Sequence, residues 1–215
     1  MGGEDANREL GKGAYHHGNL RAALLDAAGD LLESSGADAI SFRALSRHVG
    51  VSQTAPYNHF DSREGLLAAL AEQGYERLRL RQDAITDPAA ADWETLHALG
   101  RDYVAFALEK PQLYRLMFGA FITSWADHPG AALAKRRTIE PLMTALSVCL
   151  SGRSDSDRRD AAISLWCLVH GYAMLRIDGS RFLGEEVTPD DPVLERILSS
   201  ALAGLALDAG WNVPG

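Results

Sequence analysis

The sequence predicts an all-α protein of about nine helices: an N-terminal three-helix domain that contains a helix-turn-helix, followed by a helical C-terminal domain. Apolar residues recur at helical spacing through most of the chain, and alternating β-branched runs are almost absent. Clusters of glycine, proline, serine and aspartate separate segments of helical length. With 47% hydrophobic and 23% charged residues over 215 positions, the chain has the composition of a globular protein with an ample core.

Helix start and stop signals divide the first third of the chain. A helix is expected over residues 19–35, where Gly36 can end it in the left-handed conformation. Ser41 is a good N-cap for a short helix that runs through Val49, and Gly50 breaks that helix. The remaining expected segments here are a second short helix over about 53–60 and a long helix over about 63–84.

Residues 41–60 have the physical features of a helix-turn-helix. Gly50 supplies the positive φ that the tight turn needs, and Ser46 is small enough to let the two helices cross closely. The second helix then exposes short hydrogen-bonding side chains, which suit base edges in a DNA major groove. The alternative is an ordinary corner between two helices in a helical enzyme. The candidate base-reading residues are Gln53, Thr54, Asn58 and His59, and those at the rim, near phosphates, are Ser41, Arg43, Tyr57 and Arg63. Ser52 and Pro56 complete the candidate DNA-binding set.

The charge balance gives this interpretation little support. The net charge is −8, and residues 12–63 carry five basic and five acidic side chains, so the segment is neutral. An electrostatically driven nucleic-acid binder would have a strong basic patch. DNA binding is therefore predicted from the geometry of the motif and not from charge.

The second half predicts a dimer. Helices are expected over about 91–109, 111–121, 131–150, 156–178 and 191–208, with Pro141 either kinking the third of these or marking its true start. The helix at 156–178 has one apolar face with Leu165 and Val169 and another with Ile163 and Cys167, so it needs cover on both sides. Pairing of the last two helices with those of a second copy would provide that cover, and a monomeric core is the alternative.

Aromatic residues and methionines concentrate in the same half, which is typical of a mostly apolar cavity for a small molecule. Tyr103, Tyr114, Arg115 and His170 could supply polar anchors, and helical spacing places Trp166 and His170 side by side. Simple core packing is the alternative for each residue. The candidate ligand-binding residues are Tyr103, Phe106, Tyr114, Met117, Phe118, Phe121, Trp125, Trp166, His170 and Met174.

Several classes of protein are not expected. The polar start of the chain is no signal peptide, and no run of 18 or more apolar residues could span a membrane, so a cytoplasmic protein without membrane contact is predicted. Cys149 and Cys167 lie far apart in apolar helical stretches, which favours two buried free thiols over a disulfide or redox switch. No metal site, cofactor or catalytic motif is recognisable, so neither an enzyme nor a cofactor is expected; a helical ligand carrier is a further alternative.

Five stretches of the chain carry a resemblance to a known family. The helix at 19–35, the helix-turn-helix and the phrase FDSREGLLAAL at 60–70 resemble the DNA-binding domain of the TetR family, in which Tyr57, His59 and Phe60 would close the recognition helix and Arg63 would touch phosphate. Ser46 stands where that family often has alanine. KPQLYRLMFG at 110–119 and WCLVHG at 166–171 resemble the C-terminal domain of a TetR subgroup with a Trp-x-x-x-His-Gly pattern.

The resemblance implies a homodimeric regulator of transcription. Repressor is favoured over activator by family habit, with release from a palindromic operator by a small, largely apolar effector. The expected division is a flexible arm at 1–14, the helix-turn-helix domain at 15–62, a connecting helix at 63–84 and a ligand-binding and dimerisation domain at 85–215.

Overall fold

A computed structural model describes residues 20–180 and 191–208. The expected arm at 1–14, the start of the expected domain at 15–62 and the end of the chain lie outside these residues. Within them the fold is helical without a strand, as predicted. The α-helices are α1 (Leu20–Ser35), α2 (Phe42–Val49), α3 (Arg63–Ile85), α4 (Trp93–Glu109), α5 (Pro111–Phe118), α6 (Pro129–Arg137), α7 (Glu140–Cys149), α8 (Asp155–Ile177) and α9 (Pro192–Asp208), with 3₁₀ turns η1 (Ala37–Ala39), η2 (Ala55–Asn58) and η3 (Trp125–Asp127).

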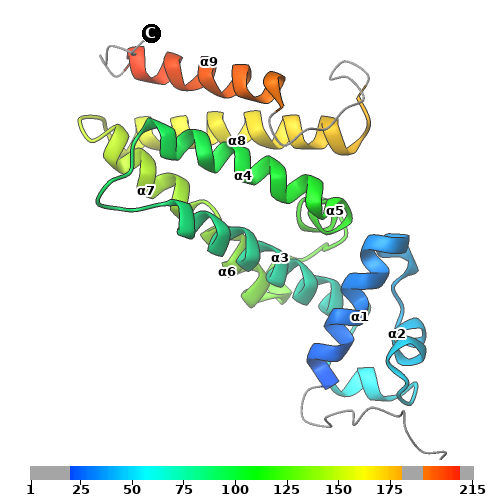
Figure 1. The fold of residues 1–215 in the computed structure, drawn as a ribbon. Helices are drawn as coiled ribbons and strands as arrows, with labels where there is room; N and C mark the ends of the chain where they lie inside the picture. Colours follow the sequence, from blue (N-terminus) through cyan, green and yellow to red (C-terminus); the bar gives the residue numbers. More distant parts are fainter. Residues whose placement is uncertain (1–19, 181–190, 209–215) are drawn as a thin grey trace, which may run out of the picture.

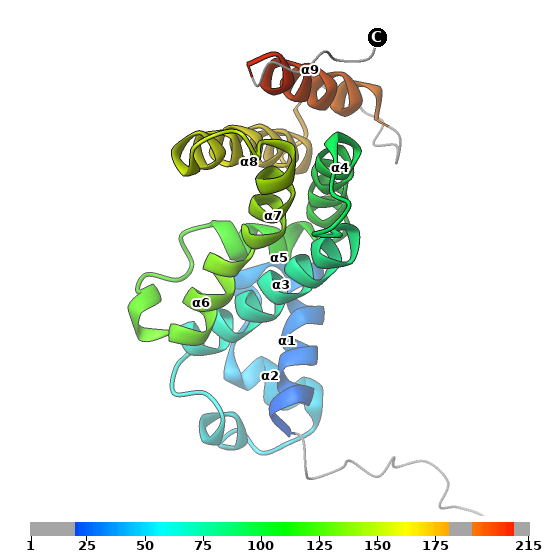
Figure 2. The ribbon, with the colours of Figure 1, turned by 90° about the vertical axis from the view of Figure 1, so that its left-hand side faces the viewer.

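The long helix α3 connects the two ends of the molecule (Figure 1). Its first turns pack on α1, and further along it packs on α4, α5, α6 and α7. Helix α8 lies across α4 and α7, and α9 covers α4 and α8 at the far end (Figure 2). None of the described helices is long and apolar enough to cross a membrane.

Local signals set the boundaries of the N-terminal helices as expected. The Ser41 hydroxyl accepts a hydrogen bond from the backbone N–H of Ala44 at 3.2 Å and caps α2. Gly50 ends α2 with φ 79°, in the left-handed region where glycine meets no steric penalty. Ser62 caps α3 in the same way, through the N–H of Gly65 at 3.0 Å.

The predicted α-helix at 53–60 is wrong. The structure has a single 3₁₀ turn, η2, in which the N–H groups of Ala55 and Tyr57 bond to carbonyls three residues earlier. Pro56 has no N–H, so it cannot donate the next bond of an α-helical ladder. The element after the Gly50 turn is therefore a short 3₁₀ turn and not a two-turn helix.

The predicted single helix at 131–150 is also wrong. The structure divides this stretch into α6 and α7, and Pro141 lies in the first turn of α7. A proline is tolerated there because first-turn N–H groups have no partner within the helix. Of the two alternatives for Pro141, the start of a helix is the one observed.

Helix α8 buries one of its two apolar faces. Leu165 and Val169 are buried, whereas Ile163 and Cys167 are exposed. The expectation that both thiols are buried is thus wrong for Cys167, because the predicted cover of its face is absent from a single chain. Cys149 is half-buried and free, and burial raises the pKa of its thiol to about 11.

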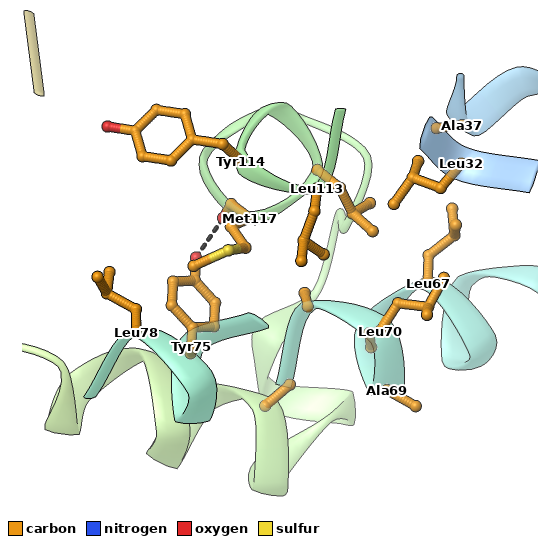
Figure 3. Packing of buried hydrophobic residues seen from close by; sticks show 14 of the residues in the cluster. Leu32, Ala37, Leu67, Ala69, Leu70, Tyr75, Leu78, Leu113, Tyr114 and Met117 are labelled. Carbon is orange, nitrogen blue, oxygen red and sulfur yellow. Dashed lines mark hydrogen bonds between the residues drawn. The ribbon is translucent and has the colours of Figure 1, made fainter. Parts of the chain in front are cut away.

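One apolar core runs from α1 through α3 and α5 to α8 and α9. Figure 3 shows the part of this core where α1, α3 and α5 meet. A side chain on Gly74 of α3 would collide with Met117 of α5, since an added Cβ would lie 2.7 Å from the Met117 sulfur. The Tyr75 hydroxyl donates to the Met117 carbonyl across the same crossing. Helices α3 and α5 therefore form a tight, specifically bonded joint between the two ends of the molecule.

Candidate nucleic-acid interface and ligand cavity

The turn after α2 presents a polar surface. Gly50 turns the chain, and the N–H of Val51 bonds to the Ser46 carbonyl at 3.0 Å. The Ser52 and Thr54 hydroxyls hydrogen-bond to each other at 3.1 Å. We define the reading surface as the exposed side chains of this segment: Ser52, Gln53, Thr54, Tyr57, Asn58 and His59.

Two buried residues and one aromatic contact hold the reading surface in place. Pro56 and Phe60 are buried beneath it, so Pro56 of the candidate set supports the turn and is not presented to a partner. The Tyr57 ring packs edge-on against Phe42 of α2 with centroids 4.7 Å apart, yet 61% of the residue is exposed. The hydroxyl end of Tyr57 can thus reach outward while its ring fixes the turn to α2.

The three other candidates at the rim differ in their engagement. Arg63 donates from Nε to the Ile40 carbonyl at 2.8 Å and from Nη2 to the Ala37 carbonyl at 2.6 Å, so it clamps the start of α3 onto the segment before α2. The Ser41 hydroxyl is engaged as an N-cap. Arg43 is exposed and forms no ion pair within residues 20–180 and 191–208. Of the two arginines, Arg43 therefore has the guanidinium that is more available to a phosphate.

A cavity of about 300 Å³ opens among the helices of the C-terminal half. Its walls come from α3, α4, α5, α6, α7, α8 and α9, and most of the side chains are apolar. The lining residues are Gln82, Leu96, Leu99, Gly100, Tyr103, Phe118, Lys135, Thr138, Ile139, Leu142, Ile163, Leu165, Trp166, Val169 and Leu198.

Three of the ten candidate ligand-binding residues line this cavity, namely Tyr103, Phe118 and Trp166. Others lie behind its wall: Phe106, Tyr114 and Met117 are sealed in the core. The remaining four are not among the lining residues either. They are Phe121, Trp125, His170 and Met174.

Tyr103 is the polar centre of a ring cluster at one wall. The Trp166 indole N–H donates to its oxygen at 3.0 Å, and the Tyr114 hydroxyl donates to it at 3.1 Å. His170 Nδ1 lies 2.6 Å from the Tyr114 hydroxyl, and its ring centroid lies 5.6 Å from that of Trp166, so the predicted neighbours on α8 do meet. With two donors on its oxygen, Tyr103 keeps its own proton for His170, 3.2 Å away, or for a molecule in the cavity.

Burial fixes the protonation of this cluster. It raises the pKa of Tyr103 to about 12 and also raises that of Tyr114, and it lowers the pKa of His170. At neutral pH all three groups are therefore uncharged. The cluster offers hydrogen bonds to a ligand but no charge.

Sequence reasoning missed twelve of the fifteen lining residues, most of them apolar. The polar ones that it missed are Gln82, Lys135 and Thr138. Each belongs to a segment expected to be polar surface or part of one continuous helix, and only the packing of α3, α6 and α7 against α4 brings them to the cavity. A polar residue within an otherwise apolar stripe, such as Gln82 in α3, was the one available signal.

Two carboxylates join the ends of the molecule. Glu33 of α1 accepts hydrogen bonds from the N–H groups of Leu113 at 3.0 Å and Gln112 at 3.4 Å, in the first turn of α5. No side chain of α5 itself caps that turn. Glu64 of α3 accepts from the N–H groups of Thr123 at 2.7 Å and Ser124 at 3.2 Å. The segment that carries Tyr114 and Phe118 is thus bonded at both of its ends to the N-terminal half.

The left-handed glycine after α2 and the exposed polar turn that follows it match the helix-turn-helix motif of DNA-binding regulators of transcription. Residues 24–70 match a family described as bacterial regulatory proteins, tetR family, and residues 96–201 match one described as tetracyclin repressor-like, C-terminal domain. The chain belongs to the TetR family.

The chain is also similar in sequence to curated proteins, one of which is named as a helix-turn-helix regulator. A nucleoid occlusion factor, SlmA, from Vibrio vulnificus is 35% identical over 102 residues, which cover 47% of this chain and 52% of SlmA, so the match spans about half of that relative. The HTH-type transcriptional regulator Rv0681 of Mycobacterium tuberculosis is 26% identical over 168 residues, covering 74% of this chain and 71% of its own.

Solved structures share the fold over most of the chain. A protein of unknown function from Rhodococcus sp. RHA1 superimposes with a TM-score of 0.74 at 28% identity, covering 92% of this chain and 98% of its own. A single-substitution variant of TetR from Acinetobacter baumannii AYE, solved in complex with minocycline, gives 0.62 at 22% identity and covers 90% and 96%.

Proposed function

We propose that this chain is a homodimeric transcriptional repressor that leaves a palindromic operator when a small, largely apolar effector binds. The observation that carries the proposal is the reading surface, which holds Gln53, Thr54, Asn58 and His59 exposed on a turn fixed by Pro56. Side chains of this kind match the donors and acceptors of base edges in the major groove. Ser41, Arg43, Tyr57 and Arg63 are assigned to the phosphates on either side.

Dimerisation through α8 and α9 is supported by their exposed apolar residues. Ile163 and Leu175 on α8 and Leu207 on α9 each expose more than half of their surface. Burial of such residues against a second copy removes apolar area from water. A two-fold dimer would place its two reading surfaces about 34 Å apart, one helical turn of DNA, and would match a palindrome.

The cavity is the proposed effector site. Its apolar walls and the Tyr103 hydroxyl fit the usual composition of small-molecule sites. Trp166, His170 and Gly171 carry the Trp-x-x-x-His-Gly pattern, and the contacts among Trp166, His170 and Tyr103 support a place for this chain in that subgroup. The proposal involves no cofactor and no catalysis, and a DNA-bound regulator would act in the cytoplasm.

Release from DNA is proposed as a population shift between two dimer geometries. A ligand changes such an equilibrium only through its different affinities for the two states. Phe118 lines the cavity, and the helix that carries it, α5, is bonded to α1 through Glu33. A shift of α5 on ligand binding would therefore move α1 and, through α3, the spacing of the reading surfaces.

DNA binding is tested on fragments that flank the gene of this protein, by fluorescence anisotropy. Gln53→Ala is expected to change which sequence is preferred, whereas Tyr57→Phe is expected to weaken binding to all sequences alike. Gln73→Ala, an exposed glutamine on α3, is the matched control and should change neither. Failure of the wild-type protein to bind any fragment would favour a ligand carrier and overturn the proposal. If the protein increased transcription of a reporter gene placed behind a bound fragment, it would be an activator and not a repressor.

A further inference from the structure

The cavity has one charged lining residue, Lys135 of α6, and no carboxylate lines it within the part of the chain that the structure describes. The Lys135 ammonium lies 4.2 Å from the centroid of the Trp125 ring, which is a cation–π contact with an uncharged side chain. It forms no ion pair with any described residue. Partial desolvation lowers the pKa of Lys135, as expected for an ammonium that lacks a counter-ion.

Lys135 lies where the cavity reaches solvent. Lys135 and Ile163 are exposed lining residues, whereas Leu99, Tyr103 and Leu198 on other walls are buried. A ligand that enters the cavity would therefore have its apolar body among the buried residues and one end beside the ammonium.

Gln82 of α3 adds a polar group within the cavity. The residue is only 4% exposed, and its Nε2 donates to the Leu99 carbonyl at 3.3 Å. Its amide oxygen accepts no hydrogen bond from residues 20–180 or 191–208. Because Gln82 lines the cavity, a ligand hydroxyl or amide there could donate a hydrogen bond to this oxygen.

We propose that the effector is an amphipathic monoanion, with an apolar body in the cavity and a carboxylate paired with Lys135. This inference rests on the proposed function of the cavity as the effector site. A second negative charge would lie unpaired among apolar side chains, and a cationic ligand would face the ammonium, so one negative charge is favoured. The volume of about 300 Å³ holds roughly ten groups of the size of a water molecule, which matches an acid of about eight carbons.

Three probes that share an eight-carbon chain test the charge: octanoate, 1-octanol and octylamine. Calorimetric titration at pH 7 should give octanoate at least about tenfold tighter than octanol, and octylamine weaker than octanol. Lys135→Met should remove the preference for octanoate and leave octanol binding unchanged, which also shows that the variant is folded. Arg136→Met removes the same charge from an exposed neighbour that does not line the cavity, and it should retain the preference.

The outcomes distinguish the proposal that the cavity is the effector site from the proposal that the effector is an anion paired with Lys135. Equal binding of octanoate and octanol, or an unchanged preference in Lys135→Met, would overturn the anionic effector and leave the cavity as an effector site. If none of the three probes bound the protein and none released it from DNA, the cavity would not be the effector site. The proposal of an anionic effector would then fail as well. Octanoate release of DNA that Lys135→Met abolishes and Arg136→Met retains would support both.

Discussion

The two ends of this molecule are built in different ways. The reading surface depends on contacts within about twenty residues: the Ser41 cap, the left-handed Gly50 and the bonds of η2. The cavity takes its lining from helices between α3 and α9, and its ring cluster joins α4, α5 and α8. A change at the reading surface should therefore alter DNA recognition alone, whereas a change near the cavity should alter stability, ligand binding and coupling together.

The largest expected effect is at the cavity end, at the buried ion pair of Arg176 with Asp191. Arg176 of α8 donates to the Asp191 carboxylate just before α9, and the Tyr172 hydroxyl donates to the same carboxylate. Arg176→Met should lower the free energy of unfolding by about 3 kcal/mol, because it leaves a buried carboxylate without its cation. Dimerisation should weaken as well, since α9 loses its ionic attachment to α8 and keeps only the Tyr172 hydrogen bond and apolar packing.

Urea unfolding followed by circular dichroism measures this loss, and sedimentation gives the oligomeric state. Arg159→Met, an exposed arginine on the same helix, is the matched control and should stay within about 0.5 kcal/mol of the parent. If Arg176→Met lowered the free energy of unfolding no more than Arg159→Met does, α9 would be held by apolar packing and not by the ion pair.

The same difference explains what the sequence could predict. The caps at Ser41 and Ser62 and the turn at Gly50 are local, so the N-terminal helices were predicted to within about a residue. The 3₁₀ turn η2 was missed because the sequence predicts a longer helix, and in the first turn of such a helix the missing N–H of Pro56 would cost little. The element observed is only one turn long.

The cavity could be predicted only in part. Helical spacing correctly placed Trp166 beside His170, because neighbours at i and i+4 are a local property. Which aromatic residues face a cavity and which fill the core depends on the packing of several helices, and Phe106 and Met117 proved to be core. Lys135 belonged to a basic stretch that no local pattern distinguishes from a solvated surface.

The link between the ends is testable at Glu33, which caps α5 from α1. Glu33→Gln keeps the shape but removes the charge that favours a helix N-terminus, an effect of about 0.3–1 kcal/mol. DNA affinity and ligand affinity should each stay within about twofold, while the ligand concentration that releases DNA should rise about threefold. Asp26→Asn on the exposed face of the same helix is the control. An unchanged release curve would exclude α5 from the coupling.

A smaller effect is expected at the reading end, from Ser46 of α2. The residue is 2% exposed, and its hydroxyl has no hydrogen-bond partner within the described residues. Ser46→Ala should stabilise the fold by about 0.5–1 kcal/mol, since it removes an unsatisfied polar group and favours the helix. Ser147→Ala, whose hydroxyl donates to the Thr144 carbonyl at 2.7 Å, should gain less in the same thermal unfolding experiment. If both variants gained the same stability, the gain in Ser46→Ala would come from the higher helix propensity of alanine and not from removal of the unsatisfied hydroxyl.

The smallest effect is a pH dependence at Glu64. Hydrogen bonds from the N–H groups of Thr123 and Ser124 hold the pKa of Glu64 below its usual value. A carboxyl with a lowered pKa stabilises the fold above its unfolded pKa of about 4.3, and this contribution is lost as the pH falls through the folded value. The melting temperature of the parent should therefore fall more steeply below about pH 4 than that of Glu64→Gln.

Water around Glu64 screens this contribution, so the difference between the two curves should be small but confined to acid pH. Asp26→Asn, which removes a carboxylate without a hydrogen bond to any described residue, should run parallel to the parent. Because Glu64 lies in the first turn of α3 and Thr123 follows α5, a Glu64→Gln curve that also ran parallel would mean that the Glu64 carboxylate does not stabilise the attachment of this segment, and that Glu33 and the Tyr75–Met117 contact provide it instead.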